Sequence, residues 1–164
     1  MRQVLLSTAI CAAIAASLVM VSYAKEQQSV DAATREVRET LMKYAAAYGA
    51  NDLDRYFSFF ADDMTVWWGT QGRLDDPTPK ARYMKTWPDS VKAGGGYHSC
   101  ELADLRIQAG PGGDAAVASY QLECIRRNPP PGQQPPVTYE MTAVLFKRAG
   151  AWKFVHWNWR TADR

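Results

Sequence analysis

The chain has 164 residues, a length suited to one domain, and its formal charge of +2 comes from 19 basic and 17 acidic side chains. Because this charge is small and both signs are mixed, composition gives no electrostatic case for nucleic-acid binding. With two histidines and three cysteines the chain offers little for a metal site, so we expect no metal and no cofactor.

The N-terminal segment has the pattern of a signal peptide. Arg2 precedes an apolar run from Val4 to Val21, which ends in Ser22-Tyr23-Ala24. A charged start, a short apolar middle and small residues before the cut are the three parts of such a peptide, so we expect residues 1–24 to be removed. One periplasmic or secreted domain, residues 25–164, would remain. The alternative is an uncleaved membrane anchor, since the run is about long enough to span a bilayer.

Apolar spacing predicts two helices in the next segment. We expect the first from Asp31, as N-cap, to Gly49, as the terminating glycine. A second, shorter helix would be capped by Asn51 or Asp52 and run through Phe60. The apolar stripe of the first helix recurs every three or four residues and consists of Val37, Leu41, Tyr44, Ala45 and Tyr48.

Weaker signals follow these helices. Acidic pairs at a helix exit usually serve turn geometry, so Ala61-Asp62-Asp63 predicts a turn, and Met64 to Trp68 a short strand. Thr78-Pro79 predicts the start of a third helix towards Val91, because proline is favoured at the first helical position. Pro88 interrupts that helix and could end it about a turn earlier.

Two strand-like runs, residues 97–109 and 115–127, flank a glycine-rich turn and predict an antiparallel hairpin. Folding the hairpin about the middle of that turn places Cys100 directly opposite Cys124, at a separation that a disulfide can bridge. These are the two cysteines that remain after removal of the leader. An exported chain with two cysteines favours one disulfide, so we predict a bond between them.

The last two strands are predicted at residues 137–147 and 151–160, after a proline-rich loop. Ala149-Gly150 forms a two-residue turn between them, so Arg148 would face Ala151. Strict alternation then divides the last strand into two faces. One face carries Trp152, Phe154, His156, Asn158 and Arg160, beside Tyr139, Met141, Ala143 and Leu145 of the neighbouring strand. The other carries Lys153, Val155, Trp157 and Trp159.

Two stretches resemble a known superfamily. Residues 46–63 carry a D-L…F-x-D-D ending, and residues 151–158 (A-W-K-F-V-H-W-N) are similar to a W-K-x-V-H-x-H closing strand. With the element order, these resemble the nuclear transport factor 2-like, or SnoaL-like, superfamily, including its ketosteroid-isomerase-like and kinase-association-domain-like members. The resemblance covers most of residues 31–160. It implies an α+β cone: a curved antiparallel sheet wrapped on a long N-terminal helix, with two shorter helices. The second histidine of the pattern is Asn158 here.

The resemblance also implies a cavity between the concave sheet face and the helices, for a small, part-apolar molecule. In it His156 would act as a general base, Asn158 would hold a developing oxyanion, and Arg160 would pair with a carboxylate ligand. His156 can equally be a structural histidine, and Tyr44 and Tyr48 can be core residues. The remaining wall residues would be Tyr44, Tyr48, Trp68 and Tyr139.

Two function classes stay open. The first is a cofactor-independent enzyme of the isomerase, dehydratase or cyclase type, and the second is a non-catalytic exported ligand-binding or assembly domain. We also expect a homodimer, because no helix is left in the chain to cover the second face of the last strands. That face is apolar and shows Val144, Phe146, Val155, Trp157 and Trp159.

Overall fold

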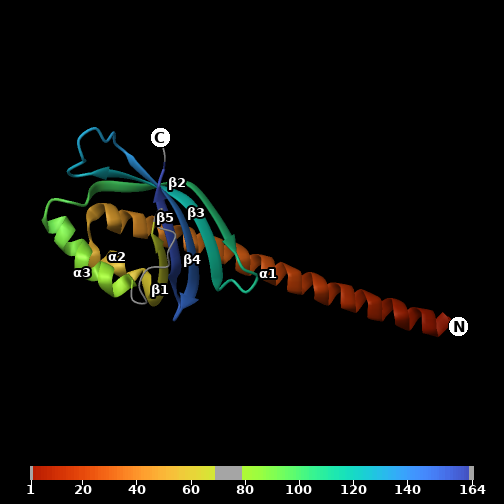
Figure 1. Ribbon diagram of the computed structural model, residues 1–164. Helices are drawn as coiled ribbons and strands as arrows, with labels where there is room; N and C mark the ends of the chain where they lie inside the picture. Colours follow the sequence, from red (N-terminus) through yellow and green to blue (C-terminus); the bar gives the residue numbers. More distant parts are fainter. Residues whose placement is uncertain (1, 69–78, 163–164) are drawn as a thin grey trace.

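The computed structural model describes residues 2–68 and 79–162, which form three helices and one five-stranded sheet. The sheet has the order β1-β5-β4-β3-β2, and the helices lie on one side of it (Figure 1). This arrangement is the predicted α+β cone. The elements are α1 (Arg2–Ala50), α2 (Leu53–Ser58), β1 (Phe60–Trp68), α3 (Pro79–Lys92), β2 (Tyr97–Ala109), β3 (Ala115–Arg126), β4 (Val137–Arg148) and β5 (Ala151–Thr161).

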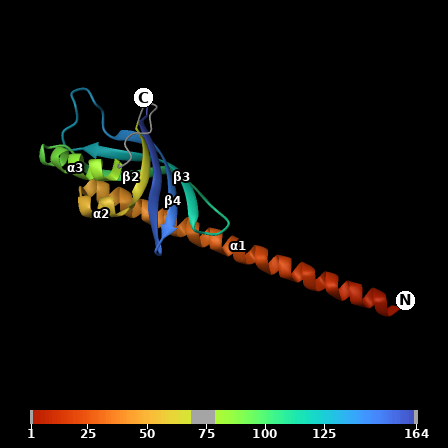
Figure 2. The same ribbon diagram turned by 60° about the horizontal axis from the view of Figure 1, so that its bottom comes forward.

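The first helix is longer than the sequence pattern indicated. It begins at Arg2, so Asp31 lies inside it and the predicted N-cap is wrong. The first part of α1 projects away from the domain, and its last turns lie beneath the sheet (Figures 1 and 2). Residues 20–28 are exposed, and from residue 20 onwards the first buried side chain is that of Ala33. Over the described ranges, no helix combines the length and apolarity that a membrane crossing needs.

The junction between α1 and α2 also differs from the prediction. The chain turns at Asn51, whose φ of 56° is left-handed, and not at Gly49. Gly49 is needed for close packing, because a Cβ added there would lie 2.4 Å from the backbone nitrogen of Cys100. The glycine therefore lets α1 touch β2. Asp52, one of the two predicted caps, accepts a hydrogen bond from the backbone N–H of Arg55.

The predicted turn at residues 61–63 is part of a strand instead. β1 already begins at Phe60 and pairs in parallel with β5, so the sheet is mixed. The two acids of the segment make ion pairs: Asp62 with Lys80 at 2.6 Å, and Asp63 with Arg148 at 2.5 Å. Both contacts join β1 to neighbouring elements, which a sequence reading of paired acids does not reveal.

The third helix is uninterrupted. Pro88 lies inside α3, which continues to Lys92 instead of ending before the proline. The two predicted hairpins are confirmed at the residue pairs that set their register. Cys100 pairs with Cys124, and the two form a disulfide with their Cα atoms 4.2 Å apart. Arg148 pairs with Ala151 across the predicted two-residue turn.

A β-bulge at Val155 reverses the faces of the rest of β5. Phe154 pairs with Leu145 as predicted, but the next pair joins His156 to Val144. A bulge inserts one extra residue, and since side chains alternate, every later side chain changes face. The predicted faces after the bulge are therefore wrong. The helix side of β5 receives Trp157 and Trp159, and the outer side receives His156, Asn158 and Arg160.

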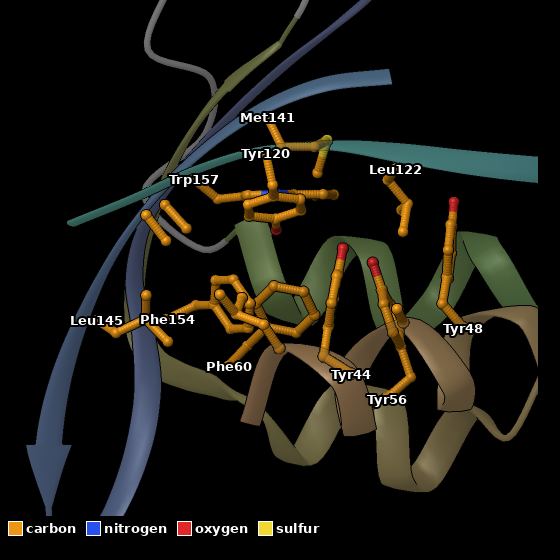
Figure 3. Packing of buried hydrophobic residues seen from close by; sticks show 14 of the residues in the cluster. Tyr44, Tyr48, Tyr56, Phe60, Tyr120, Leu122, Met141, Leu145, Phe154 and Trp157 are labelled. Atoms are coloured by element: carbon orange, nitrogen blue, oxygen red, sulfur yellow. The ribbon is translucent and has the colours of Figure 1, made fainter. Parts of the chain in front are cut away.

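The core fills the space between the sheet and α1 and α2. Tyr44, Tyr48 and Tyr56 extend from the helices with their hydroxyls towards the sheet (Figure 3). Tyr44 is fully buried, with its ring centroid 4.8 Å from that of Phe154 and 5.3 Å from that of Tyr56. Aromatic packing at these separations gives the core both apolar burial and defined geometry.

Glu36 fastens the middle of α1 to the last hairpin. Its carboxylate accepts hydrogen bonds from Lys147 Nζ at 2.6 Å and from Trp152 Nε1 at 2.8 Å. The bonds from these two side chains, with that from Lys147 the stronger influence, lower the pKa of Glu36. The helix is thus held against the sheet by charge as well as by its apolar stripe.

Candidate functional site

A cavity of about 240 Å³ lies between the inner face of the sheet and α3. Seven of its ten lining residues are aromatic, so a ligand inside would meet mainly flat, apolar walls. α1 contributes one lining residue, α3 two, and strands β2 to β5 the rest. The lining consists of Tyr48, Tyr83, Trp87, Tyr97, Leu122, Arg126, Tyr139, Met141, Trp157 and Trp159.

A chain of tyrosine hydroxyls crosses the cavity wall. Tyr48 donates to the Tyr97 hydroxyl at 3.3 Å, and the hydroxyls of Tyr97 and Tyr139 are 2.9 Å apart. Arg126 Nη2 then donates to the Tyr139 hydroxyl at 2.8 Å. Burial raises the pKa of Tyr48 and of Tyr97 well above the ordinary value. Both phenols therefore stay protonated near neutral pH and act as hydrogen-bonding groups, not as bases.

The cavity contains one cation and two unsatisfied donors. Arg126 is the only charged residue in the described lining, which includes no histidine, aspartate or glutamate. Its Nε is buried and, like Trp87 Nε1, has no hydrogen-bond partner within residues 2–68 and 79–162. Buried donors are normally paired, so these two are positioned to receive an acceptor.

Two of the predicted wall residues, Tyr48 and Tyr139, line this cavity. Tyr44 does not, because Phe154 and Tyr56 enclose it and leave none of it exposed. It lies one helical turn before Tyr48 on the same stripe, which is why the sequence could not separate the two roles. The side chain of Trp68 lies outside the described residues.

The structure does not bring His156, Asn158 and Arg160 into the cavity. The bulge turns all three to the opposite side of the sheet, so their predicted placement on the cavity wall is wrong. His156 Nδ1 is 2.7 Å from the Thr65 hydroxyl, and Arg160 forms an ion pair with Glu140 at 2.5 Å. Asn158 and Arg160 belong to an open, polar hollow on the outer face.

Sequence reasoning missed most of the α3 and β3 contributions. Tyr83 and Trp87 are four residues apart, a spacing that places both on one helix face, so this signal was present. Arg126 had no comparable signal. It stands beside Arg127 at a strand end, and only the β2–β3 pairing shows that it lies opposite Tyr97.

Comparison with known proteins identifies relatives of this architecture. The family model described as SnoaL-like domain matches residues 37–159. A protein of unknown function from Pseudomonas putida KT2440, described as NTF2-like, superposes with a TM-score of 0.64 at 23% identity, covering 82% of this chain and 89% of that one. No curated protein matches the sequence significantly.

Two further solved structures share the fold. One, provisionally assigned as a scytalone dehydratase, is from Novosphingobium aromaticivorans DSM 12444 and has a TM-score of 0.64 at 18% identity, covering 79% of this chain and 84% of that one. The other, from Erwinia carotovora atroseptica SCRI1043, is described as ketosteroid isomerase-like and has a TM-score of 0.59 at 18% identity, covering 79% and 96%. Identities this low establish a common fold and leave the chemistry open.

Proposed function

The chain belongs to the SnoaL-like domain family, and we propose that it binds a small, largely apolar molecule in the aromatic cavity. The aromatic lining is the observation that carries this proposal, because buried flat side chains around an opening favour an apolar ligand. A water molecule occupies about 30 Å³ of liquid, so 240 Å³ corresponds to about eight water-sized groups. The cavity thus suits a ligand with a single ring or a short chain.

The polar groups favour binding over proton abstraction. A general base near neutral pH is usually a histidine or a carboxylate, and the described part of the lining has neither. The tyrosines cannot replace them, since burial raises the pKa of Tyr48 and Tyr97. We therefore favour the non-catalytic ligand-binding class over an enzyme that depends on His156.

An enzymatic role is the second candidate, and the pair Tyr97–Tyr139 is its basis. The two hydroxyls, 2.9 Å apart, share one hydrogen, so the other hydrogen of the pair can be donated to a developing oxyanion beside Arg126. Isomerisation or dehydration of a carbonyl compound through its enolate develops such a charge. Turnover of a bound carbonyl compound, lost in Tyr139→Phe while binding persists, would support this class over simple binding.

Native mass spectrometry of the protein purified from its own host tests the binding proposal. Wild-type protein should carry a small molecule that denaturation releases. Met141→Trp fills the cavity and should abolish the adduct, while Ile125→Trp, which adds the same side chain at a 44% exposed position, should retain it. Circular dichroism establishes that both variants are folded. An adduct of equal abundance in both variants would show that the ligand binds elsewhere.

We further propose that residues 1–24 are a cleaved leader and that the domain is exported to the periplasm or secreted. A disulfide is typical of oxidising compartments. Residues 20–28 are exposed, so removal of the leader breaks no packing in the described side chains before Ala33. The intact mass of the mature protein should correspond to a chain whose first residue is Lys25. Recovery of the full-length chain in the membrane fraction would favour the anchor alternative.

Homodimerisation is proposed through a smaller outer patch than the sequence suggested. Trp157 and Trp159 line the cavity and therefore do not belong to the outer patch. Of the predicted patch, Val144 and Phe146, which is 42% exposed, stay on the outer face, and Val117, which is 41% exposed and lies opposite Val144, joins them. Sedimentation should show a dimer at micromolar concentration that Phe146→Glu dissociates. A monomeric wild-type protein would contradict it.

A further inference from the structure

The cavity arginine differs from two ion-paired arginines on the surface. Arg148 and Arg160 are exposed, and each is paired with a carboxylate, that of Asp63 or Glu140. Arg126 is half-buried and has only the neutral Tyr139 hydroxyl as a recorded partner in the described chain. A partly desolvated cation without a counter-charge is unfavourable unless something supplies one.

Some of the other donors of the cavity also have no recorded acceptor in the described residues. Tyr48 uses its hydrogen to reach Tyr97, and one hydrogen bridges the hydroxyls of Tyr97 and Tyr139. The second hydrogen of that pair has no recorded acceptor in residues 2–68 and 79–162. Trp87 Nε1 and Arg126 Nε are unpaired in the same part of the chain. The cavity therefore presents more donors than acceptors, which matches an acceptor-rich ligand.

The aromatic walls restrict the body of that ligand. Trp87 stacks on Tyr48 with centroids 5.6 Å apart and on Tyr97 with centroids 6.1 Å apart, at interplanar angles of 26° and 30°. Nearly parallel rings beside an open volume suit a flat molecule better than a bulky one. Leu122 and Met141 add apolar wall, and Arg126 is the one charged residue of the described lining, so no second charge of a ligand would be matched there.

From these observations we propose that the ligand is a small planar organic acid, bound as its carboxylate by Arg126. The guanidinium fork matches a carboxylate in geometry and charge, and Trp87 and the free tyrosine hydrogen lie in the same lining to complete its hydrogen bonds. This inference rests on the proposed ligand-binding function and adds the charge and shape of the molecule.

Matched pairs of acid and amide separate charge recognition from apolar binding. Benzoate, trans-cinnamate and 4-methylbenzoate are titrated by calorimetry beside benzamide, trans-cinnamamide and 4-methylbenzamide, which have the same shapes without the charge. The wild type should bind the acid of the best-fitting pair roughly 10- to 100-fold more tightly than the amide, as hydrogen bonds to a charged group predict. Arg126→Gln should reduce this ratio to near one and leave amide affinity within about twofold.

Two variants make the result specific. Arg160→Gln removes an arginine from the outer face and should keep the wild-type ratio, and Arg126→Lys should restore part of the preference for the acid. Equal affinity of the wild type for acid and amide would overturn the planar-acid inference while the cavity stands as a binding site. Failure of all six compounds to bind folded protein would overturn both the inference and the proposed function.

Discussion

The bulge at Val155 makes a quantitative prediction about two adjacent side chains. Trp157 is 4% exposed, and its ring centroid lies 5.6 Å from that of Phe60. Trp157→Ala should therefore destabilise the fold by about 3–5 kcal/mol, the range for truncation of a buried large aromatic residue. His156→Ala removes a part-exposed ring whose recorded contact is a hydrogen bond to Thr65, and it should cost about 1 kcal/mol or less.

Thermal unfolding followed by circular dichroism measures both changes. At about 3 °C per kcal/mol, Trp157→Ala should lower Tm by roughly 9–15 °C and His156→Ala by about 3 °C at most. Uninterrupted alternation along β5 would place His156 inside and Trp157 outside. The larger loss of Tm would then be that of His156→Ala. Equal losses, or a larger one for His156→Ala, would refute the bulge and the faces derived from it.

Three further changes test other contacts. Gly49→Ala should cost at least about 2 kcal/mol in urea unfolding, because its Cβ would lie 2.4 Å from the Cys100 backbone, and an unchanged midpoint would contradict that close approach. The double variant Cys100→Ser/Cys124→Ser should lose about 3.5 kcal/mol for a 24-residue separation, and reductant should bring the wild type to the same value but leave the variant unaffected. Glu36→Gln should be less stable at neutral pH. The hydrogen bond from Lys147 is the main reason that the pKa of folded Glu36 lies below its ordinary value of 4.5. The ionised Glu36 carboxylate therefore stabilises the fold above pH 4.5, and this stabilisation is lost as pH falls through the lower pKa of the folded state. The difference between wild type and Glu36→Gln should therefore shrink on acidification, and a constant difference would contradict the ion pair.

The sequence predicted the fold where local chemistry determines register. Ala149-Gly150 has the positive φ angles of a two-residue hairpin turn, 50° and 80°, and this alone sets the pairing of Arg148 with Ala151. The Cys100–Cys124 pairing followed from symmetry about a glycine-rich turn. Both predictions depend on residues close in sequence, and both are confirmed.

The candidate site was less predictable because its composition depends on a single inserted residue. Valine is as suitable in a regular strand as at a bulge, so the residue type does not reveal that the side chains after Val155 change faces. Arg126 enters the site because a register shift between Tyr97 and Ser99 pairs it with Tyr97, where the regular register would have placed Arg127. The sequence therefore indicated a part-apolar cavity in this region but placed His156, Asn158 and Arg160 in it, where the structure has Arg126.

The parallel pairing of β1 with β5 has a consequence for the order in which the chain folds. Thr65 and His156, which face each other across this pair, are 91 residues apart, so β1 gains its partner only when the last strand has left the ribosome. Contacts between residues so far apart in sequence form late, and they reduce the folding rate. During synthesis the nascent chain thus lacks one edge of its sheet. Under the export proposed above, this delay would help to keep the polypeptide unfolded until it reaches the translocation machinery.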